Sequence, residues 1–324
     1  MTRAIALLLL LLAGTGPGRP ALAADAAAGL SLRQDFEDGR LAGAALAPCH
    51  RRENALTVRT GAAREGEAAA WMELAAGRPD GAPPVRPAAE AGARPSPSCI
   101  DPKDPGAAYE DDGTERAELW EPSRSRLPFG TEVWYGFSMR VDGSVPEDDG
   151  RRLVIGQWKQ AGGRSPFVAQ RFRNRNFHVT FQQEAANGNE CRVLLAYQSE
   201  PAPQPDSLDL TSGEPCRSDV VVERFAPLPS PFGAWTDLVY RIKGSAGTDG
   251  ILELWADGAL VARATGRIGY PGGGKQYFKF GPYRDGAPYA TAAGLDSFAR
   301  GASFGEVASG RNRGALGLLA TREE

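Results

Sequence analysis

Residues Tyr277–Arg284 read YFKFGPYR, and the interpretation of the whole chain starts from this stretch. In an extended strand, successive side chains point to opposite faces, so Phe278 and Phe280 would face a core. The other face would then carry Tyr277, Lys279, Gly281 and Tyr283. Aromatic residues in this alternation predict a half-buried β-strand.

The polar face of this strand has residue types that suit a ligand-binding groove. A lysine ammonium between two phenols favours the phenolate form, because the positive charge stabilises the negative one. Gly281 would leave room for a ligand to approach the backbone. Lys275 and Arg284 add positive charge at the ends of the strand. The alternative is an ordinary amphipathic strand with exposed tyrosine and lysine.

Most of the remaining chain reads as short β-branched and aromatic runs separated by Gly, Pro, Asn and Asp. This pattern predicts an all-β sandwich or jelly roll rather than a parallel sheet. The predicted strands are Leu30–Phe36, Ala55–Arg59, Ala69–Leu74, Glu115–Glu121, Glu132–Val141, Arg152–Gln160, Phe167–Phe172, Asn176–Gln183, Arg192–Tyr197, Asp219–Glu223, Thr236–Lys243, Ile251–Ala256, Ala259–Ala264, Gln276–Tyr283 and Ser303–Val307.

Turns and loops are also legible. Asp257-Gly258 is a two-residue hairpin signal, and Asn174 with its flanking arginines predicts a second reversal. The Pro-rich stretches Gly77–Pro105 and Ser199–Pro231 read mostly as loop. With no internal repeat in view, we expect residues 24–324 to form one domain.

Two further strands carry polar faces. In Arg116-Ala117-Glu118-Leu119-Trp120, alternation sends Arg116, Glu118 and Trp120 to one face. An arginine can hold a carboxylate bidentately, and an indole can stack on a pyranose ring. An exposed Arg–Glu ion pair is the alternative. In the second strand, Gln157 and Lys159 share a face opposite Trp158, which also fits two solvated polar residues over a core tryptophan.

The segment around Asn174 adds a local cationic cluster of Arg171, Arg173 and Arg175. Such a cluster could bind a polyanion beside a cleavage point, or could be a solvated hairpin tip. His178 follows on the next strand, where it alternates with other polar residues and could enter the groove. The other mature histidine, His50, adjoins Cys49 in a predicted loop and reads as solvated.

The N-terminus reads as an export signal. Arg3, six leucines from Leu7 to Leu12 and the sequence Ala21-Leu22-Ala23 predict a signal peptide of residues 1–23, cleaved after Ala23. No later stretch approaches the roughly 20 apolar residues of a membrane helix. We therefore expect a secreted or periplasmic protein.

Cysteine usage and charge bound the chemistry further. Four cysteines in an exported chain indicate disulfides, and Cys49–Cys99 with Cys191–Cys216 is the favoured pairing. A zinc site would lack the usual CxxC spacing. Without residues 1–23 the chain has 35 basic and 40 acidic side chains, so no global basic field exists to hold nucleic acid or an anionic membrane.

The three polar strands, taken in order, resemble the groove strands of jelly-roll polysaccharide lyases. These are the alginate lyases, with R-x-E-L-R, Q-x-H and Y-F-K-x-G-x-Y motifs, and the group of heparin lyase I and glucuronan lyase. The matching segments are Arg116–Trp120, Gln157–Lys159 and Tyr277–Tyr283, and the resemblance spans roughly Glu115 to Arg284. It implies a concanavalin A-like β-jelly roll of two antiparallel sheets with a concave substrate groove.

The resemblance also implies a reaction, the β-elimination of an acidic polysaccharide at a uronate. Arg116 and Gln157 would neutralise the carboxylate, Tyr283 would protonate the leaving oxygen or act as both base and acid, and Lys279 would support Tyr283. Substrate would also contact Glu118, Trp120, Arg171, Arg173, Arg175, Tyr277 and Arg284.

Two departures from the motifs stand out. Trp120 replaces the second arginine of the first motif, which puts alginate in doubt as the substrate. Lys159 replaces the histidine of Q-x-H, so the base is open between Lys159, His178 and Tyr283. No cofactor or metal is expected, although a structural calcium ion stays open, and we expect a monomer.

Two rival functions have distinguishing features. A glycoside hydrolase needs two carboxylates flanking the bond, and the E-x-D-x-E run of laminarinase-type enzymes does not occur. A non-catalytic carbohydrate-binding protein is the stronger rival, and it should tolerate Tyr283→Phe.

Overall fold

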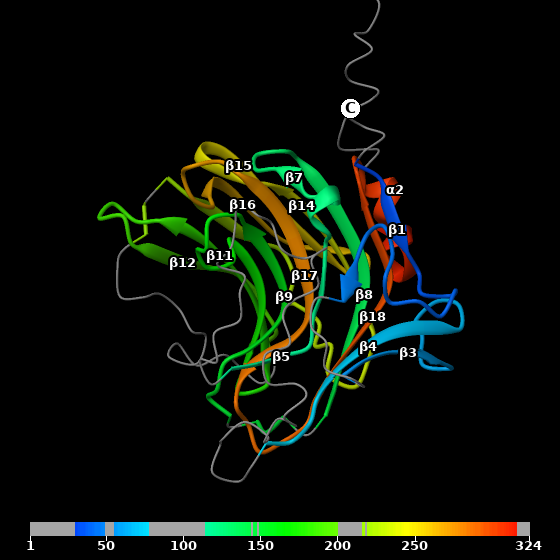
Figure 1. Ribbon diagram of the computed structural model, residues 1–324. Helices are drawn as coiled ribbons and strands as arrows, with labels where there is room; N and C mark the ends of the chain where they lie inside the picture. Colours follow the sequence, from blue (N-terminus) through cyan, green and yellow to red (C-terminus); the bar gives the residue numbers. More distant parts are fainter. Residues whose placement is uncertain are drawn as a thin grey trace, which may run out of the picture.

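The computed structural model describes residues 30–48, 55–77, 114–143, 145–147, 149–199, 216–217 and 219–315. Their strands form two antiparallel sheets that pack face to face (Figure 1). The predicted all-β sandwich is therefore confirmed. Residues 1–29, and with them the predicted signal peptide, lie outside the described part of the chain.

Sheet A has nine strands, which run in the order β13-β16-β15-β14-β8-β18-β4-β3, with β1 also paired to β18. Its strands are β1 (Leu32–Gln34), β3 (Leu56–Thr60), β4 (Ala68–Leu74), β8 (Val133–Gly143), β13 (Val221–Arg224), β14 (Thr236–Lys243), β15 (Ser245–Ala256), β16 (Ala259–Ile268) and β18 (Thr291–Gly301).

Sheet B has the order β12-β11-β10-β9-β17-β6-β2, and β5 and β7 also pair with β17. Its strands are β2 (Ala47–Pro48), β5 (Thr114–Arg116), β6 (Leu119–Trp120), β7 (Leu127–Pro128), β9 (Leu153–Gln160), β10 (Val168–Arg173), β11 (Asn176–Glu184), β12 (Glu190–Tyr197) and β17 (Lys275–Asp285). The helical turns are η2 (Ser123–Ser125), α2 (Phe304–Val307) and η4 (Gly310–Ala315).

Aromatic side chains fill the space between the sheets. Phe278 of β17 lies 4.6 Å from Trp158 of β9 and 5.2 Å from Phe137 of β8, measured between ring centroids. Phe280 is fully buried in the same cluster. The core face predicted for YFKFGPYR is thus confirmed. Because Phe278 and Phe280 face the core, the alternate residues of β17 point to the outer face of sheet B.

Two predicted turns have the expected backbone. Asp257 and Gly258 both have positive φ, as do Asn174 and Arg175. A two-residue hairpin needs this conformation at both central positions, because it matches the twist of the flanking strands.

Three strands were missed, namely the central β18 and the two-residue β2 and β7, and one predicted strand was wrong. The central strand β18 has the sequence TAAGLDSFARG, whose small residues have little β propensity. Its Gly294 lies where a Cβ would press on Trp71 and Trp235, so small residues fit here. Ser303–Val307, predicted as a strand, is instead the helical turn α2, because the buried Phe304 and Val307 are spaced for one helix face.

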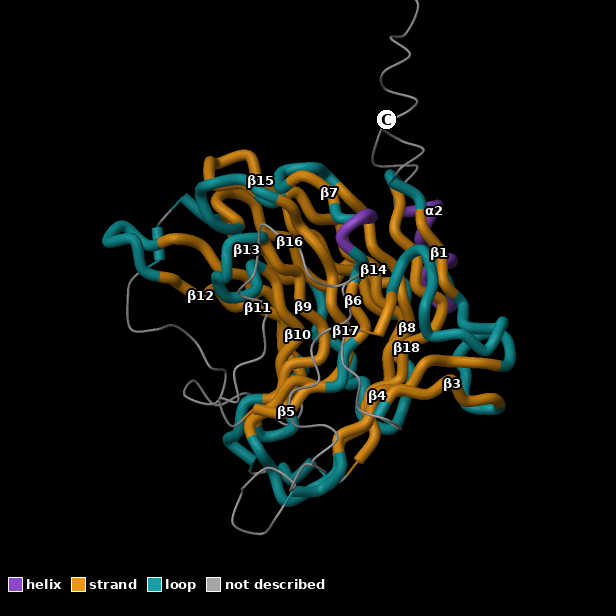
Figure 2. Tube along the Cα trace, viewed as in Figure 1, coloured by secondary structure: helices purple, strands orange, loops and turns teal. Residues whose placement is uncertain are grey.

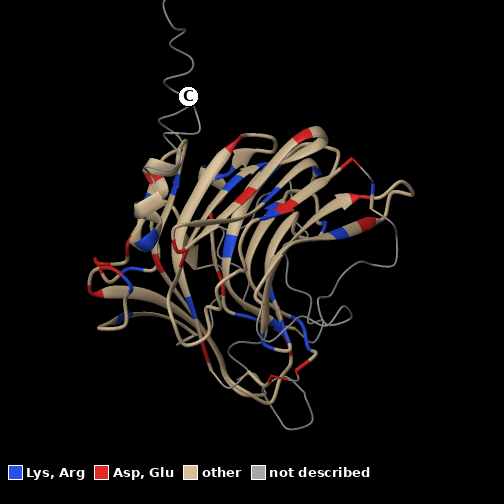
Figure 3. Cartoon of the chain, turned by 180° about the vertical axis from the view of Figure 1, so that it is seen from behind, with Lys and Arg blue, Asp and Glu red and all other residues tan. Residues whose placement is uncertain are grey.

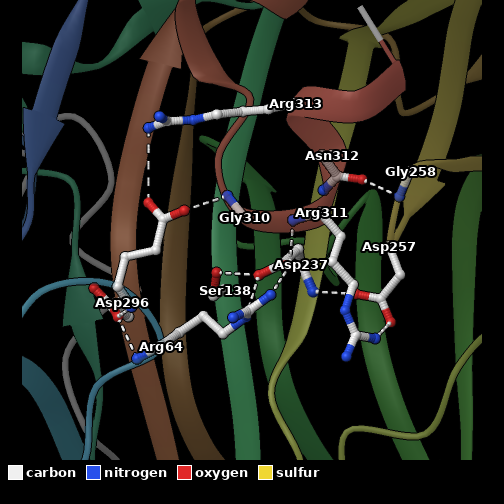
Figure 4. A network of polar contacts seen from close by, with 11 residues as sticks. Arg64, Ser138, Asp237, Asp257, Gly258, Asp296, Gly310, Arg311, Asn312 and Arg313 are labelled. Atoms are coloured by element: carbon white, nitrogen blue, oxygen red, sulfur yellow. Dashed lines mark hydrogen bonds and ion pairs between the residues drawn. The ribbon is translucent and has the colours of Figure 1, made fainter.

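The outward face of sheet A near the C-terminus carries a polar network (Figure 4). Asp237 accepts hydrogen bonds from Ser138 at 2.6 Å, from Arg64 and from the backbone of Arg311 at 2.8 Å. Asp296 accepts from the backbone of Arg64 and Glu65. These acids anchor the segment before β4 and the η4 turn onto the sheet. Within the described ranges, no group of three or more His, Cys, Asp or Glu side chains could hold a metal ion.

A buried ion pair ties sheet B to sheet A. Glu121, just after β6, pairs with Arg300 of β18 at 2.6 Å and accepts from the backbone of Phe278. Burial raises the pKa of Glu121, and Arg300 opposes that rise. The pair therefore fixes the position of the strands next to β17.

Candidate active site

Two rows of side chains cross sheet B, each built from residues that lie opposite one another in neighbouring strands. The first row is Arg116, Tyr283, Val154, Arg171, His178 and Tyr197. The second row is Trp120, Lys279, Gln157, Ala169, Thr180 and Leu194. Directly opposite residues of paired strands share a face of the sheet. The rows therefore bring the three polar strands of the sequence together on one surface.

A β-bulge in β9 is what places both rows on the same face. Gln157 and Val154 are three residues apart and would alternate to opposite faces in a regular strand. The register of β9 against β10 shifts between Gly156 and Val154, so Ile155 is an extra residue. Ile155 is fully buried in the core, while Val154 and Gln157 both line the surface with the rows.

This surface encloses a cleft of about 640 Å³. Eight basic side chains and one acidic side chain line it among the described residues: Arg116, Arg152, Lys159, Arg164, Arg171, Arg173, Arg192 and Lys279, with Asp285. Elsewhere basic and acidic residues are interspersed over the strands (Figure 3), as in the Arg241–Glu253–Arg263 ladder of sheet A. The positive charge is therefore local to the cleft, on a chain whose formal net charge is −3.

Tyr283 lies between two guanidinium groups. The Arg116 guanidinium carbon is 4.0 Å from the centroid of the Tyr283 ring, and that of Arg152 is 4.7 Å away. Asp285 holds Arg152 through a 2.7 Å ion pair and also accepts from its backbone N–H. Two guanidinium groups therefore stack on the ring of this one phenol.

Beside the second row lies a buried carboxylate. Glu118 accepts hydrogen bonds from Gln157 at 2.7 Å and from the Trp120 indole at 3.1 Å. The Lys279 ammonium sits 3.4 Å from the Trp120 ring centroid. Glu118 therefore orients Gln157 and Trp120 through these two hydrogen bonds. Its side chain is buried and does not contact solvent.

Burial lowers the pKa of Lys279 well below its ordinary value. Lys159, Arg116 and Arg126 lower it further, whereas the negative charge of Glu118 opposes the shift. Lys279 consequently holds its proton weakly, and the cations at the Tyr283 ring are Arg116 and Arg152. The Lys279 ammonium instead stacks on the Trp120 ring.

A family model for polysaccharide lyases matches residues 38–298. The chain belongs to the polysaccharide lyase family. An endo-β-1,4-glucuronan lyase from the fungus Trichoderma reesei has the same fold, with a TM-score of 0.53 and 17% identity over 86% of this chain and 98% of that one.

Two other solved structures are less similar. The family 7 alginate lyase A1-II′ gives a TM-score of 0.42 at 11% identity, over 78% of this chain and 84% of that one. The alginate lyase from Klebsiella pneumoniae gives 0.42 at 12% identity, over 78% and 86%. No curated protein sequence matches the chain.

His178 lies in the cleft of this lyase, but away from Tyr283. Its Nδ1 is 3.1 Å from the carbonyl oxygen of Asn176, which can only accept, so in the neutral ring Nδ1 carries the proton and Nε2 is the basic nitrogen. Three strand spacings separate His178 from Tyr283 along the first row, or about 14 Å between backbones. The two side chains therefore line different parts of the cleft.

Lys159 also lines the cleft of the lyase, two residues along β9 from Gln157. Its ammonium donates to the carbonyl oxygen of Arg164, in the loop that follows β9. Lys159 therefore ties that loop to the strand.

The cluster of Arg171, Arg173 and Arg175 lies only partly in the cleft lining. Arg171 and Arg173 line the cleft, and Arg171 donates to Thr180 at 3.0 Å. Arg175 instead pairs with Glu147 and stacks on Phe232, so the structure does not bring it to the cleft lining.

Arg284 and Gly281 differ from expectation. Arg284 is fully buried, pairs with Glu115 at 2.8 Å and donates to three oxygens from other segments, so it is outside the cleft lining. Gly281 has φ +130°, and a Cβ there would overlap the carbonyl oxygen of Ala117. The backbone of Ala117 and Glu118 fills the space beside Gly281, so this space is not open to a ligand.

Tyr277 is buried in β17, two residues before Lys279 of the second row. Its ring lies 6.2 Å from that of Trp120, and the Arg126 guanidinium stacks on it at 3.8 Å. Neither residue is among those that line the cleft, and both rings contact the Lys279 ammonium, at 3.4 Å for Trp120 and 5.8 Å for Tyr277.

Sequence reasoning missed Arg152, Arg164 and Arg192. Arg152 and Gln157 are separated by an odd number of residues, so simple alternation assigns Arg152 to the opposite face of the strand. Only the bulge in β9 brings both side chains to the same face. Arg192 faces Gln182, whose amide oxygen accepts from it at 3.1 Å. Arg164 pairs with Glu184 at 2.7 Å in a loop that carries no strand pattern.

The predicted Cys191–Cys216 disulfide is confirmed, and it links β12 to the segment before β13. Cys49 and Cys99 lie outside the described residues. No helix in the described ranges is long and apolar enough to cross a membrane.

Proposed function

We propose that this lyase cleaves a uronic-acid-containing polysaccharide by β-elimination and leaves an unsaturated uronate end. The observation that carries the proposal is the cleft itself, where eight basic side chains line the same surface as Tyr283 and Gln157. A polymer with a carboxylate on its sugars is the polysaccharide that such a lining would attract.

The reaction removes the C5 proton of a uronate, and the electron pair of that C–H bond forms a C4=C5 double bond. The C4–O4 bond breaks, and the leaving sugar oxygen takes a proton. Neutralising the carboxylate acidifies the C5 proton, since the charge that develops next to the carboxylate is then stabilised. Arg116 and Gln157 supply that neutralisation, and Glu118 keeps Gln157 in place.

Tyr283 acts as both base and acid in this proposal. Its phenolate takes the C5 proton, and the resulting phenol returns a proton to O4, while Arg116 and Arg152 hold the ring in place. His178 is three strand spacings from Tyr283, and the Lys159 ammonium is engaged by the Arg164 carbonyl. His178 then serves a neighbouring sugar rather than the reacting one.

The test is the ultraviolet absorbance of 4,5-unsaturated uronate during incubation with alginate, glucuronan, hyaluronan and heparin. Wild-type protein should produce a rise on at least one polymer, and Tyr283→Phe should lower kcat by about 10²-fold or more. His178→Gln is the matched control and should keep most of kcat.

Two results would count against the proposal. No absorbance rise on any polymer, with binding retained, would support a carbohydrate-binding protein instead. Equal losses in Tyr283→Phe and His178→Gln would overturn the assignment of both proton transfers to Tyr283.

We further propose that the lyase is exported and acts as a monomer outside the cytoplasm. The predicted signal peptide and the Cys191–Cys216 disulfide support export, because disulfides persist in oxidising compartments. N-terminal sequencing of the protein recovered outside the cytoplasm should begin at Ala24, and gel filtration should give one chain per particle.

A further inference from the structure

At the open edge of the sandwich, β12 approaches β13 (Figure 2). A second hollow, of about 300 Å³, lies there. Its lining includes Tyr197 of β12, Arg224 at the end of β13, and Phe225 and Pro227 beyond it. None of these residues belongs to the cleft around Tyr283.

The first row leads directly to this hollow. Tyr197 lies opposite His178 and is the last member of the row, on the outermost strand of sheet B. Four strand spacings separate it from Tyr283, or about 19 Å between backbones. That is a distance of several sugar units from the reacting bond.

The hollow combines a ring surface with a fixed cation. Phe225 is 53% exposed, whereas most aromatic residues of the described chain are buried in the core. Arg224 donates to the carbonyl oxygens of Leu195 at 2.9 Å and Leu194 at 2.6 Å, and its guanidinium lies 5.8 Å from the Tyr197 ring. The edge strand β12 thus holds the guanidinium in place before any ligand arrives.

Phe225 is also held in place. Its backbone N–H donates to the carbonyl oxygen of Val261 at 2.8 Å, which continues the pairing of β13 with β16. An exposed aromatic ring on a rigid backbone, next to an arginine, suits a pyranose ring that carries a carboxylate.

We infer that Tyr197, Arg224 and Phe225 form a distal subsite for a sugar of the same acidic polysaccharide, at the point where the polymer leaves the cleft. The inference rests on the proposed function, because the polymer's path is set by the cleft. It adds that long chains gain affinity from a contact that short ones cannot reach.

The experiment compares Phe225→Ala with the control Val221→Ala, which removes another exposed apolar side chain of the same edge that does not line the hollow. Phe225→Ala should raise KM for the cleaved polymer about 2- to 10-fold and leave a trisaccharide substrate unaffected. Val221→Ala should change neither, and Phe225→Tyr should restore the wild-type KM.

Equal effects of Phe225→Ala on polymer and trisaccharide, or no effect on either, would overturn the subsite. Polymer affinity is also measured by calorimetry on a Tyr283→Phe background, with and without Phe225→Ala. If the wild-type protein cleaves nothing, the proposed reaction fails, while an affinity loss confined to Phe225→Ala would still support the subsite.

Discussion

Replacing Arg284 distinguishes a structural role from a substrate contact. Arg284→Met removes a fully buried guanidinium that donates to Glu115, to the Tyr289 and Ala75 carbonyls and to the Thr291 hydroxyl. Breaking a buried ion pair by removing one partner costs about 3–5 kcal/mol, because the other charge stays buried and uncompensated. A domain has a total stability of about 5–15 kcal/mol, so this variant should be marginal but measurable at low temperature.

Urea unfolding followed by tryptophan fluorescence gives the loss of stability. The double variant Arg284→Met with Glu115→Leu should recover only part of it, since three other acceptors of Arg284 remain buried without their donor. The Michaelis constant of the folded protein should not change. A small loss of stability together with a raised KM would refute the reasoning, because it would mean that Arg284 contacts substrate.

Two more changes test the neighbourhood of β17. Gly281→Ala should destabilise the protein by about 1–3 kcal/mol in thermal or urea unfolding, because it combines a positive φ with overlap on Ala117; Gly272→Ala has a similar φ in open space, and an equal loss there would contradict the steric part. Lys279→Met should stabilise the fold at neutral pH, since burial lowers the pKa of Lys279 in the folded state and the unfolded state binds more protons. The gain in the free energy of unfolding over the wild type should shrink as pH rises towards 10.5. Urea unfolding at several pH values measures this gain, and a gain that does not change with pH would disprove the prediction.

Alternation predicted most of the architecture because both sheets bury one face. The faces of Phe278 and Phe280, the I′-type turns at Asn174 and Asp257, and the Cys191–Cys216 bridge all follow from local pattern and spacing. The strand β18 did not, because its small residues have little β propensity, and at Gly294 the packing of Trp71 and Trp235 leaves no room for a side chain.

The candidate site was harder to predict for a different reason. Arg284 looks like a groove cation in the sequence, and only the tertiary partners Glu115 and Thr291 reveal it as buried. Arg152 reaches Tyr283 only because β9 contains an extra residue, which simple alternation does not predict. Contacts between distant segments decide the first case, and an irregularity within one strand decides the second.

The extra residue in β9 also bears on how sequences of this family are aligned. Arg152 and Val154 belong to one run of alternating residues, and Gln157 and Lys159 to another, and Ile155 with Gly156 joins the two runs. A relative shorter by one residue between positions 154 and 157 would keep every recognisable letter, yet turn one of the runs into the core. Conserved segment length, more than conserved composition, would therefore mark the relatives that share this cleft.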